Sequence, residues 1–269
     1  MNLRVLRVLR GAQSQSEESG VTQRREHYSY AMYADPAVAR SFDERRFGGP
    51  IGELVAATQA RVVASMIGDL NGRTILDVGT GTGRAALMLA HEGARVTGID
   101  ASGEMLQVAR QRAAGEQLQL QFQQGDAHHL QFADRAFEIG VCLRLLMHAP
   151  DWQRCLAELC RVASRLVIFD YPALASAAAL ESLSRRLKHA AGGRTEAYRV
   201  LRHAAVEQAL ERSGFRVRSV HRQFVLPIRF HRLIGSLRFT QAFEHLLERA
   251  GLLRLCGSPV TVCAERCAY

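Results

Sequence analysis

From residue 74 onward, strand-like and helix-like patterns of apolar and polar positions alternate along the chain. Short apolar or alternating runs, typical of strands, occupy residues 74–78, 95–100, 118–123, 137–143 and 165–170. Stretches with helical composition or spacing separate several of them, at residues 84–92, 102–113 and 151–162. Strands that alternate with helices pair in parallel through right-handed crossovers. The pattern therefore predicts an α/β fold around a parallel sheet.

The alternation of predicted strands and helices is interrupted twice after Pro172. Residues 173–200 are mostly helical and basic in character, and residues 227–258 form a second interruption between prolines. Between and after them the alternation returns, as a helix at 203–213, a strand at 215–221 and a last strand at 260–265. A further helix is predicted at about 51–67, before the first strand.

The positive charge of the chain lies in its second half. Residues 1–134 carry 14 basic and 15 acidic side chains, whereas residues 135–269 carry 21 basic and 11 acidic ones. The formal net charge of +9 therefore belongs entirely to the second half. This asymmetry indicates an anionic partner for that half: an acidic small molecule, a membrane surface or nucleic acid.

Cysteine usage and the first residues bear on the compartment. The six cysteines include no C-x-x-C pair, so we expect reduced, structural side chains in a cytoplasmic protein without a metal site. Residues 1–20 begin with arginines among Leu and Val and continue as a polar stretch. We expect a flexible tail there, with a basic helix at a membrane surface as the alternative. No secretory signal or membrane-spanning segment is expected.

A glycine-rich turn follows the first predicted strand. The segment ILDVGTGTGR (75–84) places Gly79, Gly81 and Gly83 at alternate positions before a helix. Such a turn lets a ligand approach the main chain beside the free N–H groups of a helix start. The pyrophosphate pattern G-x-G-x-x-G would need a third glycine where Arg84 stands, and Asp77 would repel a pyrophosphate. The loop instead suits a ligand with an ammonium group and a sulfonium.

Two further acids end the next two predicted strands. Asp100 follows Asp77 by 23 residues, where a carboxylate can accept hydrogen bonds from both hydroxyls of a ribose. Asp126 in GDAHHL can accept from an adenine amino group. Each acid alone fits an ordinary helix or turn cap as well. Together with the glycine turn, the three acids favour a nucleoside-containing ligand.

These motifs together resemble the class I S-adenosylmethionine-dependent methyltransferases, of the small-molecule type related to quinone-methylating enzymes. The resemblance rests on ILDVGTGTGR (75–84), GID (98–100), GDAHHLQFAD (125–134) and FEIGVCLRLLMHAPDW (137–152), and it is strong over residues 70–170. It implies a doubly wound, seven-stranded, mostly parallel sheet, the Rossmann-like methyltransferase fold, with helical cap insertions. The last strand, VTVCAE (260–265), is then antiparallel.

The resemblance also assigns roles to the segments of the chain. In order, they are a flexible tail (1–20), an N-terminal helical lid (21–70), the cofactor-binding core (71–172), a cap insertion (173–200), the continued core (201–226), a second cap insertion (227–258) and the last strand of the core (259–269).

The cofactor implied by the resemblance is S-adenosyl-L-methionine. The residues that it assigns are Asp77, Gly79, Gly81 and Gly83 for the amino-acid end, Asp100 for the ribose, Ala101 and Met105 beside the adenine, Asp126 and the Ala127 backbone for the adenine edge, and Leu143 beside the methionine portion. Met105 fits plain core packing equally well.

The acceptor side is less specific. His148 is the candidate general base, with a structural loop histidine as the alternative. A positive charge beside a sulfonium is costly, so Arg144 is expected to point toward the substrate. Tyr30 and Tyr33 either orient the substrate from the lid or pack against the sheet edge, and Tyr171 is expected near the substrate mouth.

The cap segments indicate the chemistry of the acceptor. Residues 173–258 contain 15 basic and 6 acidic side chains together with the apolar runs FVLPI (224–228) and RLIGSLRF (232–239). A basic and apolar cap favours a small anionic or lipid-like acceptor that is methylated at oxygen or carbon. The alternative is that these arginines are ordinary solvent-exposed residues on the surfaces of helices and bind no acceptor.

Two other functions remain open. The sequence pI of about 9.8 prompts a nucleic-acid methyltransferase, but no N-P-P-Y-like loop follows the fourth strand and basic residues are not interleaved with aromatics. We therefore do not expect a nucleic-acid partner. A non-catalytic protein that only binds S-adenosylmethionine is the second alternative, which turnover of the cofactor distinguishes.

Overall fold

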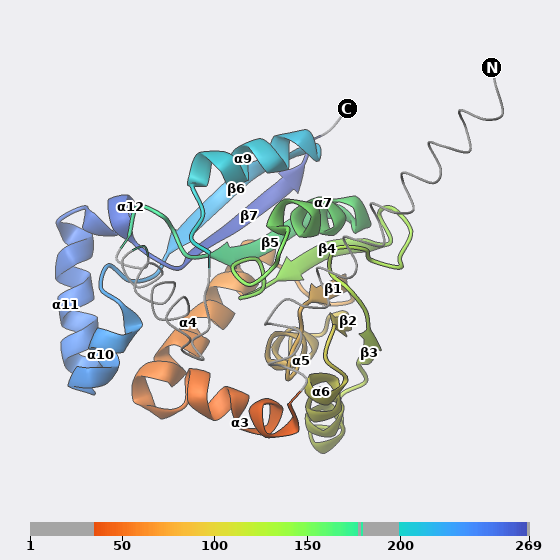
Figure 1. The fold of residues 1–269 in the computed structure, drawn as a ribbon, viewed down its shortest axis with the longest axis horizontal. Helices are drawn as coiled ribbons and strands as arrows, with labels where there is room; N and C mark the ends of the chain where they lie inside the picture. Colours follow the sequence, from red (N-terminus) through yellow and green to blue (C-terminus); the bar gives the residue numbers. More distant parts are fainter. Residues whose placement is uncertain (1–34, 177–178, 180–198, 268–269) are drawn as a thin grey trace.

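A computed structural model describes residues 35–176, 179 and 199–267. Its centre is a seven-stranded sheet in the order β3-β2-β1-β4-β5-β7-β6 (Figure 1). The strands are β1 (Thr74–Val78), β2 (Arg95–Asp100), β3 (Gln121–Gln124), β4 (Phe137–Cys142), β5 (Ala163–Tyr171), β6 (Phe215–Arg222) and β7 (Val260–Arg266). Strand β7 pairs antiparallel with both of its neighbours, and the other pairs are parallel. The predicted α/β sheet and its antiparallel last strand are confirmed.

Helices cover both faces of the sheet. Their bounds are α3 (Pro36–Phe47), α4 (Gly49–Ile67), α5 (Arg84–His91), α6 (Gly103–Gly115), α7 (Trp152–Val162), α9 (His203–Arg212), α10 (Ile228–Ile234), α11 (Leu237–Arg249) and α12 (Leu252–Cys256). Figure 1 shows α7 and α9 on one side of the sheet and α4, α5 and α6 on the other. One apolar cluster joins α7 and α9 to the sheet, and a second joins α4 and α5 to it. The sheet therefore lies between two packed layers of helices.

Local sequence signals explain where several elements begin. The side chain of Ser102 accepts a hydrogen bond from the Met105 amide and starts α6, and the side chain of Asp151 accepts from the Arg154 amide and starts α7. Residues 166–171 of β5 are all fully buried, as the continuous apolar run predicts for a central strand.

The third strand differs from its prediction. The alternating stretch 118–123 predicts a strand, but only Gln121–Gln124 pairs with β2. The amide of Leu118 donates to the carbonyl of Ala113, so this part of the chain closes the end of α6 instead. Because β3 is an edge strand with a single neighbour, no second partner extends its pairing.

The two segments outside the core are described in part. Residues 227–258, predicted as a cap insertion, fold into α10, α11 and α12 between β6 and β7. The insertion predicted at 173–200 lies mostly outside the described residues, as do the tail at 1–20 and both Tyr30 and Tyr33. Within the part of the chain that is described, no helix is long and apolar enough to cross a membrane.

Candidate cofactor site

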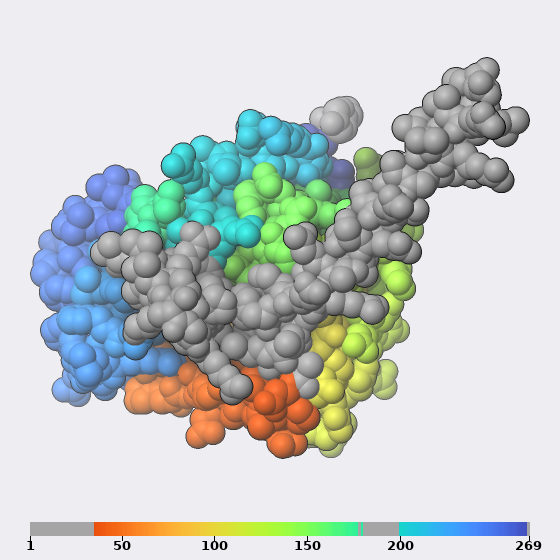
Figure 2. Space-filling model, viewed as in Figure 1, coloured from red at the N-terminus to blue at the C-terminus, as the bar shows by residue number. Residues whose placement is uncertain are grey.

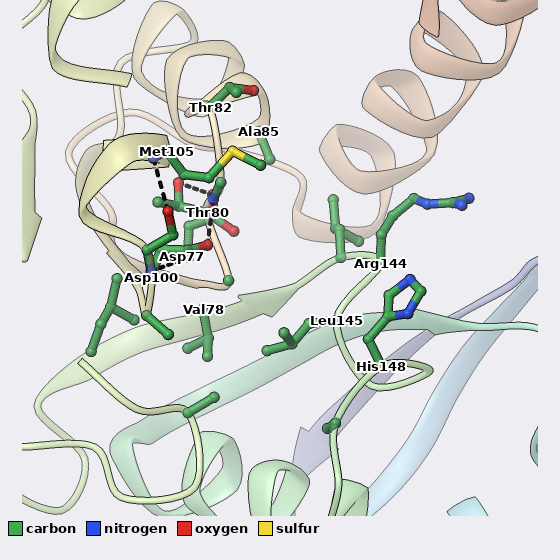
Figure 3. A pocket seen from close by; sticks show the side chains of 18 of the residues that line it. Asp77, Val78, Thr80, Thr82, Ala85, Asp100, Met105, Arg144, Leu145 and His148 are labelled. Atoms are coloured by element: carbon green, nitrogen blue, oxygen red, sulfur yellow. Dashed lines mark hydrogen bonds between the residues drawn. The ribbon is translucent and has the colours of Figure 1, made fainter. Parts of the chain in front are cut away.

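A pocket opens at the carboxyl ends of β1, β2 and β4. Ten of the site residues predicted from the sequence line it: Asp77, Gly79, Gly81, Asp100, Ala101, Met105, Ala127, Leu143, Arg144 and His148. Figure 3 shows Asp77, Thr80, Asp100 and Met105 gathered on one side, with Arg144 and His148 on the other. We call the first side the acid–glycine wall and the second side the acceptor wall. Parallel strands bring their carboxyl ends to one sheet edge, which is why these distant residues meet.

The glycine turn is held open by two glycines with left-handed backbones. Gly79 and Gly81 have φ angles of 72° and 56°, a region that other residues rarely adopt. The amide of Gly79 donates to the carbonyl of Ile99 at 2.8 Å, which ties the turn to β2. A Cβ atom on Gly81 would meet nothing within 4 Å, so that backbone faces the open pocket. A ligand can therefore lie directly against the main chain there.

Gly83, predicted to contact the cofactor, lies at the start of α5, and that contact stays a prediction. It does not line the pocket, and its φ angle of 82° starts α5. A Cβ atom there would lie 2.8 Å from Cδ1 of Leu87 and 3.0 Å from the Cβ of Ala109 on α6. This glycine therefore permits the close packing of α5 against α6.

Asp77 is a buried carboxyl group in the wall of the pocket. Its residue is 1% exposed, and the Thr80 hydroxyl donates to its Oδ2 at 2.7 Å. Burial raises the pKa of Asp77 to about 6, and the Thr80 hydrogen bond and the charge of Arg84 oppose that rise. Burial disfavours the charged form of Asp77, and a bound cation would stabilise that form. The ammonium group of an amino acid is such a cation.

Asp100 is held by backbone donors at the mouth of the same turn. Its Oδ2 accepts from the Gly81 amide at 2.8 Å and its Oδ1 accepts from the Ser102 amide at 2.9 Å. Burial raises the pKa of Asp100, while these backbone bonds favour the charged form. The carboxylate is therefore fixed in place where β2 ends.

The third predicted acid acts through its neighbour. The Asp126 carboxylate accepts from the His128 amide at 2.9 Å, and its Oδ1 lies 2.6 Å from Nδ1 of His128. His128 is buried and lines the pocket with Ala127, whereas Asp126 does not line it. Asp126 orients the His128 ring, and its contact with an adenine remains a prediction.

Two cationic or basic side chains form the acceptor wall after β4. Arg144 has a φ angle of 60°, an uncommon conformation for an arginine. Its backbone amide donates to Oδ1 of Asp170, which holds the turn in this conformation. His148 is 6% exposed, and its amide donates to the carbonyl of Leu145 at 2.8 Å. The Arg144 side chain extends away from the acid–glycine wall, and the His148 ring points toward Arg144 (Figure 3).

A partly buried chain of hydrogen bonds, which the sequence analysis did not predict, lies beside this wall. Nε2 of Gln59 donates to Asp170 at 2.9 Å, and the Arg84 guanidinium donates to Oε1 of Gln59. Arg84 also lies over the Phe47 ring, 4.1 Å from its centroid. Burial raises the pKa of Asp170 and lowers that of Arg84. Asp170 lies at the carboxyl end of β5, as Asp77 and Asp100 lie at the carboxyl ends of β1 and β2. An acid at the end of a predicted strand is therefore the sequence signal that could have identified Asp170.

Helix α3 closes over the glycine turn. Asp43 accepts from the Thr82 hydroxyl at 2.9 Å and pairs with Arg112 of α6. Phe42 and Phe47 of the same helix line the pocket. The sequence predicts a lid in this region but does not identify Asp43 as its attachment.

Tyr171 does not reach the pocket. It is fully buried, it stacks on Phe169 and its hydroxyl contacts Nδ1 of His203 at 2.5 Å. Side chains alternate in direction along β5, so Tyr171 faces the layer of α7 and α9. It therefore serves the core rather than the predicted substrate mouth.

Comparisons with known proteins agree with this geometry. Residues 75–165 match a family model described as a methyltransferase domain. The chain is 38% identical over 109 residues to a demethylmenaquinone methyltransferase of Deinococcus radiodurans, across 39% of this chain and 45% of that protein. It is 36% identical over 131 residues to a ubiquinone biosynthesis O-methyltransferase of Alkalilimnicola ehrlichii, across 48% and 53%. The chain thus spans about half the length of these curated relatives.

A solved structure shows the same fold. The magnesium protoporphyrin IX methyltransferase of Synechocystis, solved with bound S-adenosylhomocysteine, superposes with a TM-score of 0.58 at 21% identity, covering 84% of this chain and 93% of that one. The sheet order, the acid–glycine wall and the matched domain all agree with the resemblance seen in the sequence. Over residues 75–165 the chain is therefore similar to methyltransferase domains, and its fold is the one found in solved methyltransferase structures.

Proposed function

We propose that the protein transfers a methyl group from S-adenosylmethionine to oxygen or carbon of a small anionic or amphiphilic acceptor. The observation that carries this proposal is the pairing of two unlike walls in one pocket. The acid–glycine wall offers Asp77, Gly81 and Asp100, and the acceptor wall offers Arg144 and His148.

The acid–glycine wall fits each part of the cofactor. The buried Asp77 carboxylate would hold the ammonium group, and Asp100 would accept from the ribose hydroxyls. Met105 and Ala127 line the pocket and would provide apolar contacts for the adenine. When bound, S-adenosylmethionine supplies an electrophilic methyl group, so the protein mainly has to align the acceptor and exclude water.

The acceptor wall would align and activate the substrate. The Arg144 guanidinium suits a carboxylate or a phenolate on the acceptor. The His148 ring would remove a proton from an acidic hydroxyl or carbon, and Phe42 and Phe47 of α3 would shield the site from water. The relatives named demethylmenaquinone methyltransferase and ubiquinone biosynthesis O-methyltransferase support a quinol-like acceptor.

Calorimetric titration tests the cofactor site first. Wild-type protein is expected to bind S-adenosylmethionine and S-adenosylhomocysteine, and Asp100→Ala is expected to weaken both by roughly a hundredfold because charged hydrogen-bond partners are lost. Glu92→Ala removes an exposed carboxylate near the end of α5 and serves as the matched control. Absence of binding by folded wild-type protein would contradict the proposal.

Turnover then tests catalysis. Formation of S-adenosylhomocysteine is measured with demethylated quinols, with aromatic acids and with unmodified RNA as separate acceptors. Turnover with a quinol or an aromatic acid supports the proposal. Methylation of RNA alone would favour the nucleic-acid alternative, and binding without any turnover would favour a non-catalytic cofactor-binding protein.

A further inference from the structure

Exposed apolar side chains gather on one segment of the molecule. Among the described residues, ten large apolar side chains are exposed, and all but Leu174 and Val220 belong to α10, α11 and α12. The eight on these helices are Phe230, Leu233, Ile234, Leu237, Phe239, Leu246, Leu252 and Leu255. We call them the α10–α12 surface. Scattered exposed leucines need no explanation, but a concentration of this kind marks an interaction site.

The fold fixes helix α11 with its apolar flank outward. Its buried residues are Thr240 and Glu244, both polar. Glu244 accepts from the amides of Val225 and Leu226, at 2.8 Å and 3.1 Å, and from Nε2 of His231 at 2.8 Å. These bonds set the rotation of α11, because a turn of the helix about its axis would break all three. Phe239 and Leu246 are left exposed as a consequence of that rotation.

Arginines border the exposed apolar side chains. Arg238 and Arg249 are exposed and eleven residues apart, so they lie on nearly the same side of α11, beside Leu246. Arg254 is exposed on α12. The acids of α10–α12 are Glu244, which is buried among its three donors, and Glu248. The surface is therefore both apolar and positively charged.

We propose that the α10–α12 surface docks on an anionic lipid membrane. A helix with aromatic and leucine side chains on one flank and arginines beside them lies in the plane of the membrane interface. Anionic headgroups attract the arginines while the apolar side chains enter the acyl boundary. A second copy of the same surface would bring like charges together, which favours lipid over self-association.

The surface is joined to a wall of the pocket. Nη1 of Arg232 in α10 donates to the carbonyl of Arg45 at 3.2 Å, close to the end of α3. Figure 2 shows the blue α10–α12 segment beside the orange α3–α4 segment. Helix α3 carries Phe42 and Phe47 of the pocket. Docking would therefore bring the pocket close to the lipid, and only this consequence for acceptor delivery rests on the proposed function.

Vesicle co-sedimentation of the full chain tests the docking without any acceptor. Wild-type protein is expected to sediment with phosphatidylcholine vesicles that contain phosphatidylglycerol, and far less with phosphatidylcholine alone. Phe239→Ser with Leu246→Ser is expected to weaken binding roughly tenfold or more. Arg238→Gln, Arg249→Gln and Arg254→Gln together are expected to weaken it on the order of a hundredfold, and added salt should weaken the wild type.

Matched variants make the result specific. Leu174→Ser with Val220→Ser changes the two large apolar side chains that are exposed outside the surface among the described residues. A triple change of the exposed Arg40, Arg212 and Arg218 to Gln matches the loss of charge. Both controls should sediment like wild type. S-adenosylhomocysteine binding shows that each variant is folded, and circular dichroism does so if that binding fails in all of them.

Three results would overturn the docking proposal. The first is wild-type protein that ignores anionic vesicles, and the second is surface variants that bind them like wild type. The third comes from light scattering: a wild-type dimer that Phe239→Ser with Leu246→Ser converts to a monomer would assign the surface to a second copy. Each result is independent of whether the protein methylates any acceptor.

Discussion

The two walls of the pocket are built from different kinds of group. The acid–glycine wall uses main-chain amides, glycines and carboxylates, and the Gly81–Asp100 hydrogen bond joins residues only 19 apart. The acceptor wall uses long side chains supported from behind, and the Gln59–Asp170 hydrogen bond joins residues 111 apart. The first wall is a local device at the ends of two adjacent strands. The second exists only when distant elements pack together.

Under the proposed function, this difference separates recognition of the cofactor from recognition of the acceptor. The acid–glycine wall is held by hydrogen bonds within β1, β2 and the turn between them, so its shape does not depend on the side chains across the pocket. Arg144 and His148 lie in the loop after β4 and outside the sheet, so substitutions there should leave the strand pairing unchanged. Variants in the two walls should therefore have separable effects.

The largest expected effect is on the acceptor wall. His148→Gln removes the candidate base, and kcat is expected to fall by about a hundred- to ten-thousandfold, with an unchanged Kd for S-adenosylhomocysteine. The pH dependence of kcat that proton removal by His148 contributes should disappear in the variant. The exposed His129→Gln is the matched control. A variant that loses stability but keeps the wild-type pH profile would assign His148 a structural role.

The next effect concerns the cost of burying Asp77. Because the folded protein raises the pKa of Asp77 from 3.8 to about 6, it binds that proton more tightly than the unfolded chain does. The resulting stability is fully present below about pH 4 and is lost as the pH rises through about 6. For Asp77 alone this loss in the unfolding free energy of the cofactor-free protein is about 3 kcal/mol.

Asp77→Asn tests this trade between stability and binding. Asn cannot ionise but keeps an oxygen for the Thr80 hydroxyl. Denaturant titration near neutral pH should therefore give the cofactor-free variant a free energy of unfolding that is higher by up to about 3 kcal/mol. Its affinity for S-adenosylmethionine should fall at the same time. The exposed Asp69→Asn is the control. Equal stability of variant and wild type would show that the Asp77 charge has little energetic cost in the fold.

A moderate effect is expected at Arg144. Arg144→Gln should raise the KM for an anionic acceptor by roughly tenfold or more, because one charge-assisted hydrogen bond is lost. Steady-state kinetics with the acid and its methyl ester provides the control, since the neutral ester should not distinguish the two proteins. An equal change in KM for acid and ester would remove Arg144 from anion recognition.

The smallest effect is expected where α3 is attached. Asp43→Ala removes the partner of Thr82 and Arg112. Because this ion pair is partly exposed, the affinity for S-adenosylhomocysteine should fall only about threefold to fivefold, mainly through faster dissociation in stopped-flow measurements. The neighbouring exposed Glu44→Ala should behave as wild type. A loss as large as that of Asp100→Ala would make α3 part of the cofactor site itself.

The sequence by itself determined the sheet and the acid–glycine wall. Hydrophobic periodicity, the cap at Ser102 and the glycine turn act over a few residues, so they can be read without the fold. Asp77, Gly81 and Asp100 meet because parallel strands end at one edge, a rule that the strand pattern already implies. The residues of this wall are close together in the sequence and also close together in the structure.

Only the tertiary structure decided the roles that depend on long-range packing. In the structure, Gly83 lies at the contact of α5 with α6 and Tyr171 lies in the core. Asp170 is buried and accepts a hydrogen bond from the Arg144 amide. The tertiary structure also turned the apolar flank of α11 outward, because three donors hold Glu244 inside. A sequence pattern gives the face that a helix prefers to bury. Which face is buried depends on all the partners that the fold brings to it, and these are distant in the chain.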